Sequence, residues 1–222
     1  MLRQTNYTVP ADILQEAIAS SNTDEFKFSL NRPTGDFFYD PWEIKPELKG
    51  TVWDRLLDTL PLQKGEARII TLKPGTSYYC HADADDRWHL NLRAEYAFLC
   101  DIDSHSMYEL KPDGIWYTMN AGPKHSAVNF GNVDRVQLVV RQLFEKTSLV
   151  DPVTVKIVLK KQVIDFRYQF DNSVSTWLNY AQKNKLITDF TFVNNEVGFK
   201  IEKIALHDLK EMLPEIFEIQ EI

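Results

Sequence analysis

Short segments in which apolar and polar residues alternate dominate the chain from residue 67 to residue 144. Along residues 88–93, tryptophan and leucine alternate with histidine, asparagine and arginine, so a strand here has one apolar and one polar face. Glycine- and proline-containing turns separate the segments. Further strands are expected at residues 67–72, 78–81, 96–102, 106–110, 115–119, 126–130 and 135–144. Many short, closely spaced strands predict a mainly β fold, and a double-sheet jelly roll is the natural form for it.

The residues before this block show mixed periodicity. A short helix is expected from Pro10 onward, because Ile13, Ala17 and Ile18 share one helical face. Residues 26–30 alternate like a strand, and residues 31–41 are rich in turn formers. A second helix is expected near residues 46–60, where apolar residues recur at helical spacing until Pro61. We therefore predict N-terminal helices packed on the β core.

The pattern changes again after Thr147. Two alternating segments, 153–159 and 164–170, precede a helix that Asn172-Ser173 caps. A hairpin is expected over residues 190–201, with its turn at Asn194-Asn195, and a final amphipathic helix over residues 206–217. These elements predict a small α+β appendage. The expected domains are therefore a jelly-roll domain with its N-terminal helical segment at 1–147 and the appendage at 148–222.

Composition restricts the classes of function. The formal net charge of −7 and the pI near 5.3 argue against binding to nucleic acid or to an anionic membrane, since both need a basic surface. No apolar run approaches the roughly 20 residues that span a bilayer. The start, MLRQTNYTVPADIL, lacks the apolar core of a signal peptide. A cytoplasmic protein with Cys80 and Cys100 as reduced thiols is therefore expected.

Three residues in the β block have the chemistry of a metal site. His81 and Asp83 are two positions apart, so they point to the same side of an extended segment, and His125 lies on a later strand. Two histidines and one carboxylate are the protein ligands of the facial triad that holds non-haem Fe(II). Arg135 follows His125 by ten positions, and a buried arginine is well shaped to bind a carboxylate. The residues thus indicate an iron site beside a carboxylate-bearing co-substrate.

Simpler interpretations of the same residues stay open at this point. Asp83 lies in an acidic run, so it is also explained as a solvated loop residue, with Asp85 as the metal ligand instead. Arg135 is also explained as a surface strand residue with Asp134, and Arg87 as a counter-charge for Asp85 and Asp86. Asn129 and Trp116 are expected in buried structural roles, and His105 and His207 in surface or structural roles.

Two motifs in this block resemble a known family. The segments LKPGTSYYCHADADDRWHLNL and GPKHSAVNFGNVDRVQLVV resemble the two metal motifs of the aspartyl/asparaginyl β-hydroxylase family, which includes bacterial free-proline hydroxylases. The resemblance covers roughly residues 65–145 and includes the ligand order, the His-to-Arg spacing and the Pro-Gly turn before the first histidine. It implies an Fe(II)- and 2-oxoglutarate-dependent dioxygenase on a double-stranded β-helix, which is a cupin-like jelly roll.

The resemblance also implies roles for individual residues. Iron would be bound by His81, Asp83 and His125, and the distal carboxylate of 2-oxoglutarate by Arg135. Arg87 and His89 match an Arg-x-His pair that helps to hold the co-substrate, although here the pair lies closer to the first histidine. A polar position that binds co-substrate in some members is the apolar Ile70 in this chain.

The expected function is hydroxylation of an amino-acid side chain with O2, either in a free amino acid such as proline or in an Asp-, Asn- or Pro-type residue of a peptide. Succinate and CO2 would be released. One alternative is a cupin-type metalloenzyme that does not use 2-oxoglutarate. Another is a non-catalytic jelly-roll binding protein, since a fold alone does not establish a reaction.

Overall fold

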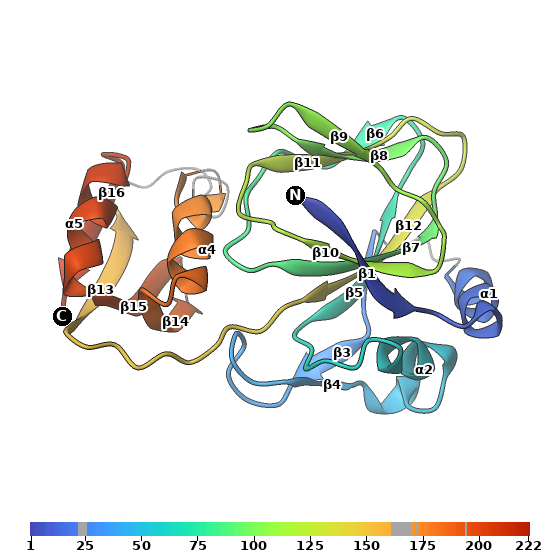
Figure 1. Cartoon of the computed structure of the whole chain (residues 1–222), viewed down its shortest axis with the longest axis horizontal. Coiled ribbons are helices and arrows are strands. Elements are labelled where there is room, and N and C mark those ends of the chain that lie inside the picture. The colour runs from blue at the N-terminus through green and yellow to red at the C-terminus, as the bar shows by residue number, and fades with distance from the viewer. Residues whose placement is uncertain (22–25, 161–169, 172, 194) are drawn as a thin grey trace.

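The chain folds around a jelly roll of eight antiparallel strands (Figure 1). The computed structural model describes residues 1–21, 26–160, 170–171, 173–193 and 195–222. The pairs are nested: β5 pairs with β12, β6 with β11, β7 with β10, and β8 with β9. This pairing defines a jelly roll, so the predicted fold class is confirmed. The eight strands are β5 (Ala67–Leu72), β6 (Thr76–Ser77), β7 (Arg87–Arg93), β8 (Ala97–Asp101), β9 (Ser106–Glu109), β10 (Ile115–Met119), β11 (His125–Asn129) and β12 (Arg135–Arg141).

The strands form two facing sheets. The larger sheet has the order β1-β10-β7-β12-β5-β2 and the smaller sheet the order β6-β11-β8-β9. On β7, Leu90 and Leu92 face outward and pack in a core that helices α1 (Ala11–Ser20) and α2 (Val52–Asp58) cover. The alternate residues of the strand face the space between the sheets. Because helices cover the outer face, the larger sheet is buried on both sides, and its inner face is free to carry polar chemistry.

The N-terminal segment matches the prediction in part. Helix α1 and strand β2 (Lys27–Ser29) form where the pattern placed them. Residues 31–41, predicted as turns, include one strand of a short hairpin made by β3 (Asn31–Pro33) and β4 (Trp42–Ile44). The helix predicted over residues 46–60 is divided into a 3-10 turn at Pro46–Leu48 and α2, because Gly50 has a left-handed φ of 76° between them. The edge strand β1 (Leu2–Thr8) was not predicted.

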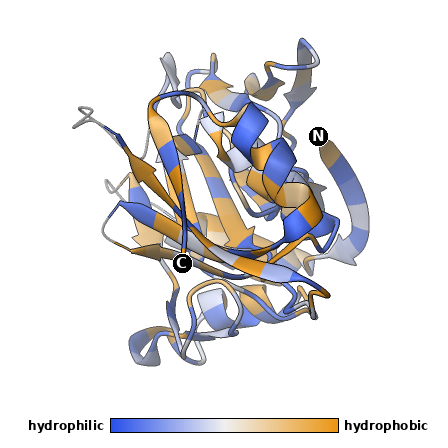
Figure 2. Cartoon of the chain, turned by 90° about the vertical axis from the view of Figure 1, so that its left-hand side faces the viewer, coloured by the Kyte–Doolittle hydropathy of each residue, from blue (hydrophilic) through white to orange (hydrophobic). Residues whose placement is uncertain are grey.

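The C-terminal residues form an α+β unit around a second antiparallel sheet of order β14-β15-β13-β16. Its elements are β13 (Pro152–Leu159), α4 (Ser175–Lys183), β14 (Ile187–Val193), β15 (Glu196–Glu202), α5 (Lys203–Met212) and β16 (Phe217–Glu221). Figure 2 shows hydrophilic and hydrophobic residues alternating along its strands. The final helix was predicted too long. It ends at Met212, since Leu213 is extended before Pro214, and Phe217 is buried at the start of β16 instead.

Most of the predicted strand 164–170, and Asn172 of the predicted cap, lie outside the described residues. The boundary at residues 147 and 148 stays a prediction. Among the described residues, no helix has both the length and the apolar character that crossing a membrane requires.

Aromatic residues join the C-terminal unit to the jelly roll. Phe38 stacks on Phe144, with ring centroids 5.3 Å apart, and both rings contact Phe190 of β14 edge-on. Helix α4 lies on the side of the unit that faces the jelly roll (Figure 1). Its Thr176 donates a hydrogen bond to the carbonyl of Gly122, over 2.7 Å. The unit is therefore packed directly beside the loop that leads into β11.

Candidate metal centre

The two central histidines are brought together by a backbone bridge between the sheet strands. His81 follows β6, and His125 is the first residue of β11. Their backbones exchange two hydrogen bonds of 2.9 and 2.7 Å, and their ring centroids are 4.4 Å apart. Both residues are buried. The antiparallel pairing thus places two imidazoles from distant parts of the sequence on the same side of the smaller sheet.

Hydrogen bonds fix the tautomer of both rings. Nδ1 of His81 lies 3.0 Å from the carbonyl oxygen of Tyr79, and Nδ1 of His125 lies 2.8 Å from that of Pro123. A carbonyl oxygen only accepts, so each Nδ1 is the donor and each neutral ring keeps a lone pair on Nε2. This is the usual arrangement for a metal-binding histidine, whose second nitrogen is held by a hydrogen-bond acceptor.

Asp83 completes the group. Its Oδ2 lies 3.7 Å from Nε2 of His81 and 3.7 Å from Nε2 of His125. One ligand atom from each of the three residues falls within 4.8 Å of the others. Burial raises the pKa of Asp83, but Arg87 and the two imidazoles outweigh it and hold the net pKa well below its usual range. A carboxylate and two imidazoles that ligate through Nε2 are a donor set for a divalent transition metal, so this group is able to bind one.

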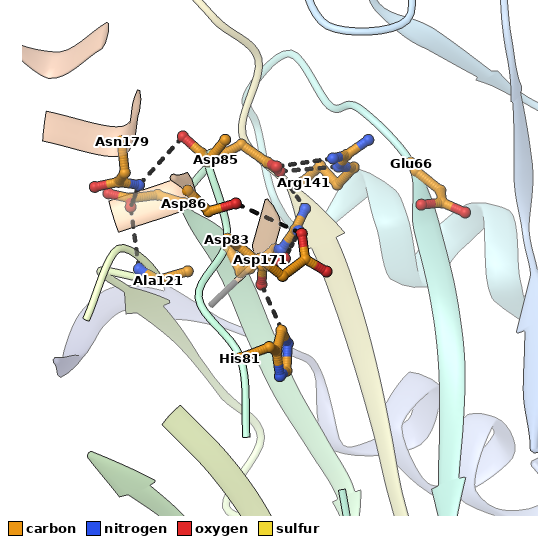
Figure 3. A network of polar contacts seen from close by, with 12 residues as sticks. Glu66, His81, Asp83, Asp85, Asp86, Ala121, Arg141, Asp171 and Asn179 are labelled. Carbon is orange, nitrogen blue, oxygen red and sulfur yellow. Dashed lines mark hydrogen bonds and ion pairs between the residues drawn. The ribbon is translucent and has the colours of Figure 1, made fainter. Parts of the chain in front are cut away.

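Asp85, the alternative ligand, forms ion pairs with two arginines. Arg141 binds its carboxylate with two hydrogen bonds of 2.8 Å (Figure 3). Arg87 also contacts Oδ2. Only 3% of its surface is exposed. With both oxygens held by guanidinium groups, Asp85 has no free face for a metal. The structure favours Asp83 as the ligand, and the description of Asp83 as a solvated loop residue is wrong.

A cavity lies beside the triad between the two sheets. Arg135 lines it from β12 and is only 5% exposed. Its side chain donates to Oε1 of Gln137, its Nε has no hydrogen-bond partner in the described structure, and burial lowers its pKa to about 10. The group is still charged at neutral pH. Within the described part of the chain, it forms no ion pair with a carboxylate, so the cavity contains an uncompensated cation.

His89 also lines this cavity from β7. Neither ring nitrogen has a hydrogen-bond partner among the described residues. Burial, followed by the charge of Arg135, lowers the pKa of His89 to about 3, so the ring is neutral. A buried imidazole without partners has hydrogen-bonding capacity left for a ligand.

A second, more open cavity adjoins the first. It shares Arg68, Tyr78, His81, Asp83 and Arg87 with the inner cavity. The other residues that line it are Lys27, Phe37, Phe38, Glu66, Tyr79, Arg141, Asp171 and Phe192, and of these Asp171 and Phe192 belong to the C-terminal unit. The metal group therefore lies at the junction between a narrow inner cavity and a wider outer one.

All six site residues predicted from the sequence line the inner cavity. Arg135 is buried, so its interpretation as a surface residue is wrong. Trp116 and Asn129 have the structural roles expected of them: Trp116 donates to Thr59 in the outer core, and Asn129 caps a turn through the carbonyls of Leu72 and Val133.

Three further residues of the site were missed, namely Arg68, Gln137 and Arg141. The signal that identifies them is the two-residue period of the strands. Gln137 and Arg141 share a strand face with Arg135, and Arg68 shares one with Ile70.

No protein-family model and no curated protein matches the chain. Solved structures with some similarity include a cupin domain from Bordetella pertussis Tohama I (12% identity, TM-score 0.32, covering 54% of this chain and 97% of that one). A prolyl-4-hydroxylase from Pseudomonas putida has 13% identity and a TM-score of 0.42, covering 63% of this chain and 85% of that one. The DMSP lyase DddQ from Ruegeria pomeroyi DSS-3 has 14% identity and a TM-score of 0.32, covering 67% and 80%. Sequence identities and TM-scores at this level do not indicate the function of this chain.

Proposed function

We propose that this chain is an Fe(II)- and 2-oxoglutarate-dependent dioxygenase that hydroxylates an amino-acid side chain, in a free amino acid such as proline or in a residue of a peptide. One observation carries the proposal: the uncompensated buried cation of Arg135 shares a cavity with the His81, Asp83 and His125 group. A buried charge without a partner is costly, so an anionic ligand is expected beside Arg135. A small diacid that binds the metal at one end and Arg135 at the other satisfies both groups.

The metal would be held by Nε2 of each histidine and Oδ2 of Asp83. Iron bound there supplies the oxidative chemistry, in which O2 is consumed and 2-oxoglutarate is decarboxylated to succinate and CO2. The protein keeps the two imidazoles in the ligating tautomer through the carbonyls of Tyr79 and Pro123. It also excludes bulk water, since the ligands are buried between the sheets.

The co-substrate would lie in the inner cavity. Arg135 binds its distal carboxylate with the donors that the protein leaves free. Ile70 occupies a position that is polar in some β-hydroxylases, and its cross-strand partner is Gln137, which contacts Arg135. Gln137 therefore supplies a polar group at this end of the cavity. His89, neutral and without partners, is placed to donate to the co-substrate from β7.

The substrate would enter through the outer cavity. Aromatic rings of Phe37, Phe38 and Tyr79 line it and suit the aliphatic part of an amino acid. On one wall, Lys27 and Arg68 share the single carboxylate of Glu66, so positive charge is in excess there. That excess supports a substrate with a carboxylate of its own.

A combined binding and turnover experiment tests the proposal. The purified protein is loaded anaerobically with Fe(II), its metal content is determined by elemental analysis, and 2-oxoglutarate is titrated while the thermal midpoint is followed. We expect one metal per chain and a midpoint that rises with 2-oxoglutarate only in the metal-loaded protein. A panel of amino acids and peptides is then screened for succinate release and for a mass gain of one oxygen. Metal binding without any response to 2-oxoglutarate would favour a different cupin-type metalloenzyme, and no metal binding would favour a binding protein.

A further inference from the structure

The guanidinium group of Arg87 lies between two buried carboxylates. Its Nη2 is 2.8 Å from Oδ1 of Asp83, and its Nη1 contacts Oδ2 of Asp85. Only 3% of Arg87 is exposed. Burial lowers the pKa of Arg87, but Asp83 and Asp85 outweigh that effect and raise the net value. Arg87 is thus a buried cation, and each of its two terminal nitrogens donates to a carboxylate of the protein.

Asp85 is held in turn by Arg141, the last residue of β12. Nε and Nη2 of Arg141 donate to the two oxygens of Asp85, each over 2.8 Å, which is the bidentate geometry of a strong charge-assisted pair. Arg141 is also covered by aromatic rings, since its guanidinium carbon lies 4.5 Å from the ring centre of Phe37 and 5.1 Å from that of Phe38. Asp85 is therefore anchored to the larger sheet (Figure 3).

These contacts determine which oxygen of Asp83 is free. Oδ1 accepts from Arg87, whereas Oδ2 faces the two imidazoles at 3.7 Å. A carboxylate with one oxygen occupied by a guanidinium binds a metal through the other oxygen alone. Because the second arm of the guanidinium contacts Asp85, Arg87 holds its first arm at Oδ1 of Asp83 and orients that carboxylate.

We propose that Arg87 and Asp85 are positioning residues for the metal ligand Asp83, that Arg141 anchors them, and that Arg87 does not hold the co-substrate. The inference rests on the metal group in the proposed function, but it departs from the role that the family resemblance gives to Arg87.

The charges of the network support this distinction. Arg87 and Arg141 carry two positive charges, which Asp83 and Asp85 balance. No surplus charge is left in this group for a further anion, whereas Arg135 in the same cavity has no carboxylate partner among the described residues. Removing Arg87 is therefore expected to disturb the metal, and removing Arg135 to disturb the co-substrate.

The test compares two affinities in the same set of variants. Arg87→Gln, Asp85→Asn and Arg141→Lys are each titrated with Co(II) in the absence of 2-oxoglutarate, and the visible absorption of the bound Co(II) is recorded. We expect metal affinity roughly 10- to 100-fold weaker than in the wild type, as for other residues that orient a metal ligand, together with an altered Co(II) spectrum. The metal-saturated Asp85→Asn protein should keep the wild-type affinity for 2-oxoglutarate. Arg135→Gln, the matched control, should keep the metal affinity and spectrum but lose affinity for 2-oxoglutarate.

Thermal unfolding of each variant shows whether it is folded before it is titrated. Arg141→Lys retains the positive charge but loses the bidentate contact with Asp85. Its metal affinity therefore tests the inference even if Arg87→Gln or Asp85→Asn does not fold. Wild-type metal affinity and spectrum in folded Arg87→Gln or Arg141→Lys would overturn the inference while leaving the proposed function intact. A wild-type protein that binds no Co(II) would overturn the proposed function itself.

Discussion

His81 and His125 are 44 positions apart in sequence but form one antiparallel bridge, with each backbone N–H bonded to the carbonyl of the other residue. In both cases, Nδ1 bonds to the carbonyl two residues earlier in the chain, Tyr79 or Pro123. The two rings therefore have the same tautomer and point Nε2 at the same carboxylate oxygen, Oδ2 of Asp83.

Replacing either histidine should remove the metal. His81→Ala or His125→Ala leaves two of three ligands, so we expect metal content near zero and no succinate release. Elemental analysis of dialysed protein and a succinate assay measure both quantities. His207→Ala, on the exposed face of α5, serves as the control and should retain metal. A His81→Ala protein with normal metal content and turnover would contradict the assignment.

Arg135→Gln should weaken 2-oxoglutarate binding without affecting the metal. Hydrogen bonds to a charged group contribute about 1.5–3 kcal/mol, so we expect a rise of roughly 10- to 100-fold in the 2-oxoglutarate concentration that gives half-maximal turnover. The measurement is a titration of succinate release in iron-loaded protein. Arg32→Gln removes an exposed arginine that pairs with Glu43 and should leave the titration unchanged. Equal titrations for Arg135→Gln and wild type would exclude the predicted carboxylate contact.

Acid should destabilise the metal-free protein partly through His89. Its pKa is about 3 when folded, because of burial and then Arg135, compared with about 6.5 for an unfolded histidine. Below pH 6.5 this histidine is protonated in the unfolded chain but stays neutral in the folded chain. The free energy of unfolding therefore falls as the pH falls. Between pH 6 and pH 4, the unfolding free energy of the wild type should drop faster than that of His89→Gln, by roughly 1.4 kcal/mol per pH unit. Urea unfolding at several pH values measures the difference, and parallel curves would refute it.

Gly131 lies in the turn between the strands that carry His125 and Arg135. A Cβ there would lie 2.0 Å from the backbone oxygen of Glu95, which has no room to move. Gly131→Ala should therefore lower the unfolding free energy by about 1–3 kcal/mol. Gly35→Ala is the comparison, since its Cβ would meet only the flexible carboxylate of Asp40 in an exposed turn. Denaturant unfolding should show a smaller loss for Gly35→Ala, and the reverse order would count against the backbone clash.

Asn179 of α4 connects the C-terminal unit to the loop that carries Asp83. Its Nδ2 donates to Oδ1 of Asp86 over 2.9 Å and to the carbonyl of Ala84 over 3.3 Å. Asn179→Ala should lower the unfolding free energy by about 1–3 kcal/mol, because partly buried acceptors lose a donor. Tyr180→Ala, at the exposed neighbouring position of the same helix, should cost less. Thermal or denaturant unfolding compares the two, and equal losses would argue against a specific contact.

The local pattern was sufficient for most strands of the jelly roll and for the residues of the metal group. Alternation along residues 88–93 correctly predicted that His89 and Leu90 face opposite sides of the sheet. It failed where tertiary contacts override local preference. Residues 2–8 form β1 only because they pair with β10, and Phe217 belongs to a strand that pairs with β13 rather than to a helix.

The order and spacing of residues along the chain were enough to identify the chemical groups of the candidate site, namely two histidines, a nearby aspartate and an arginine on segments of alternating polarity. Spacing along the chain does not distinguish Asp83 from Asp85 as the candidate ligand. The tertiary structure favours Asp83, because Arg141, 56 residues from Asp85 in the sequence, donates to both oxygens of Asp85. The tertiary structure also places a carboxylate on either side of Arg87, whereas Arg135 has no carboxylate partner among the described residues. Side-chain partners across a sheet depend on strand register, which the spacing of residues along one strand does not contain.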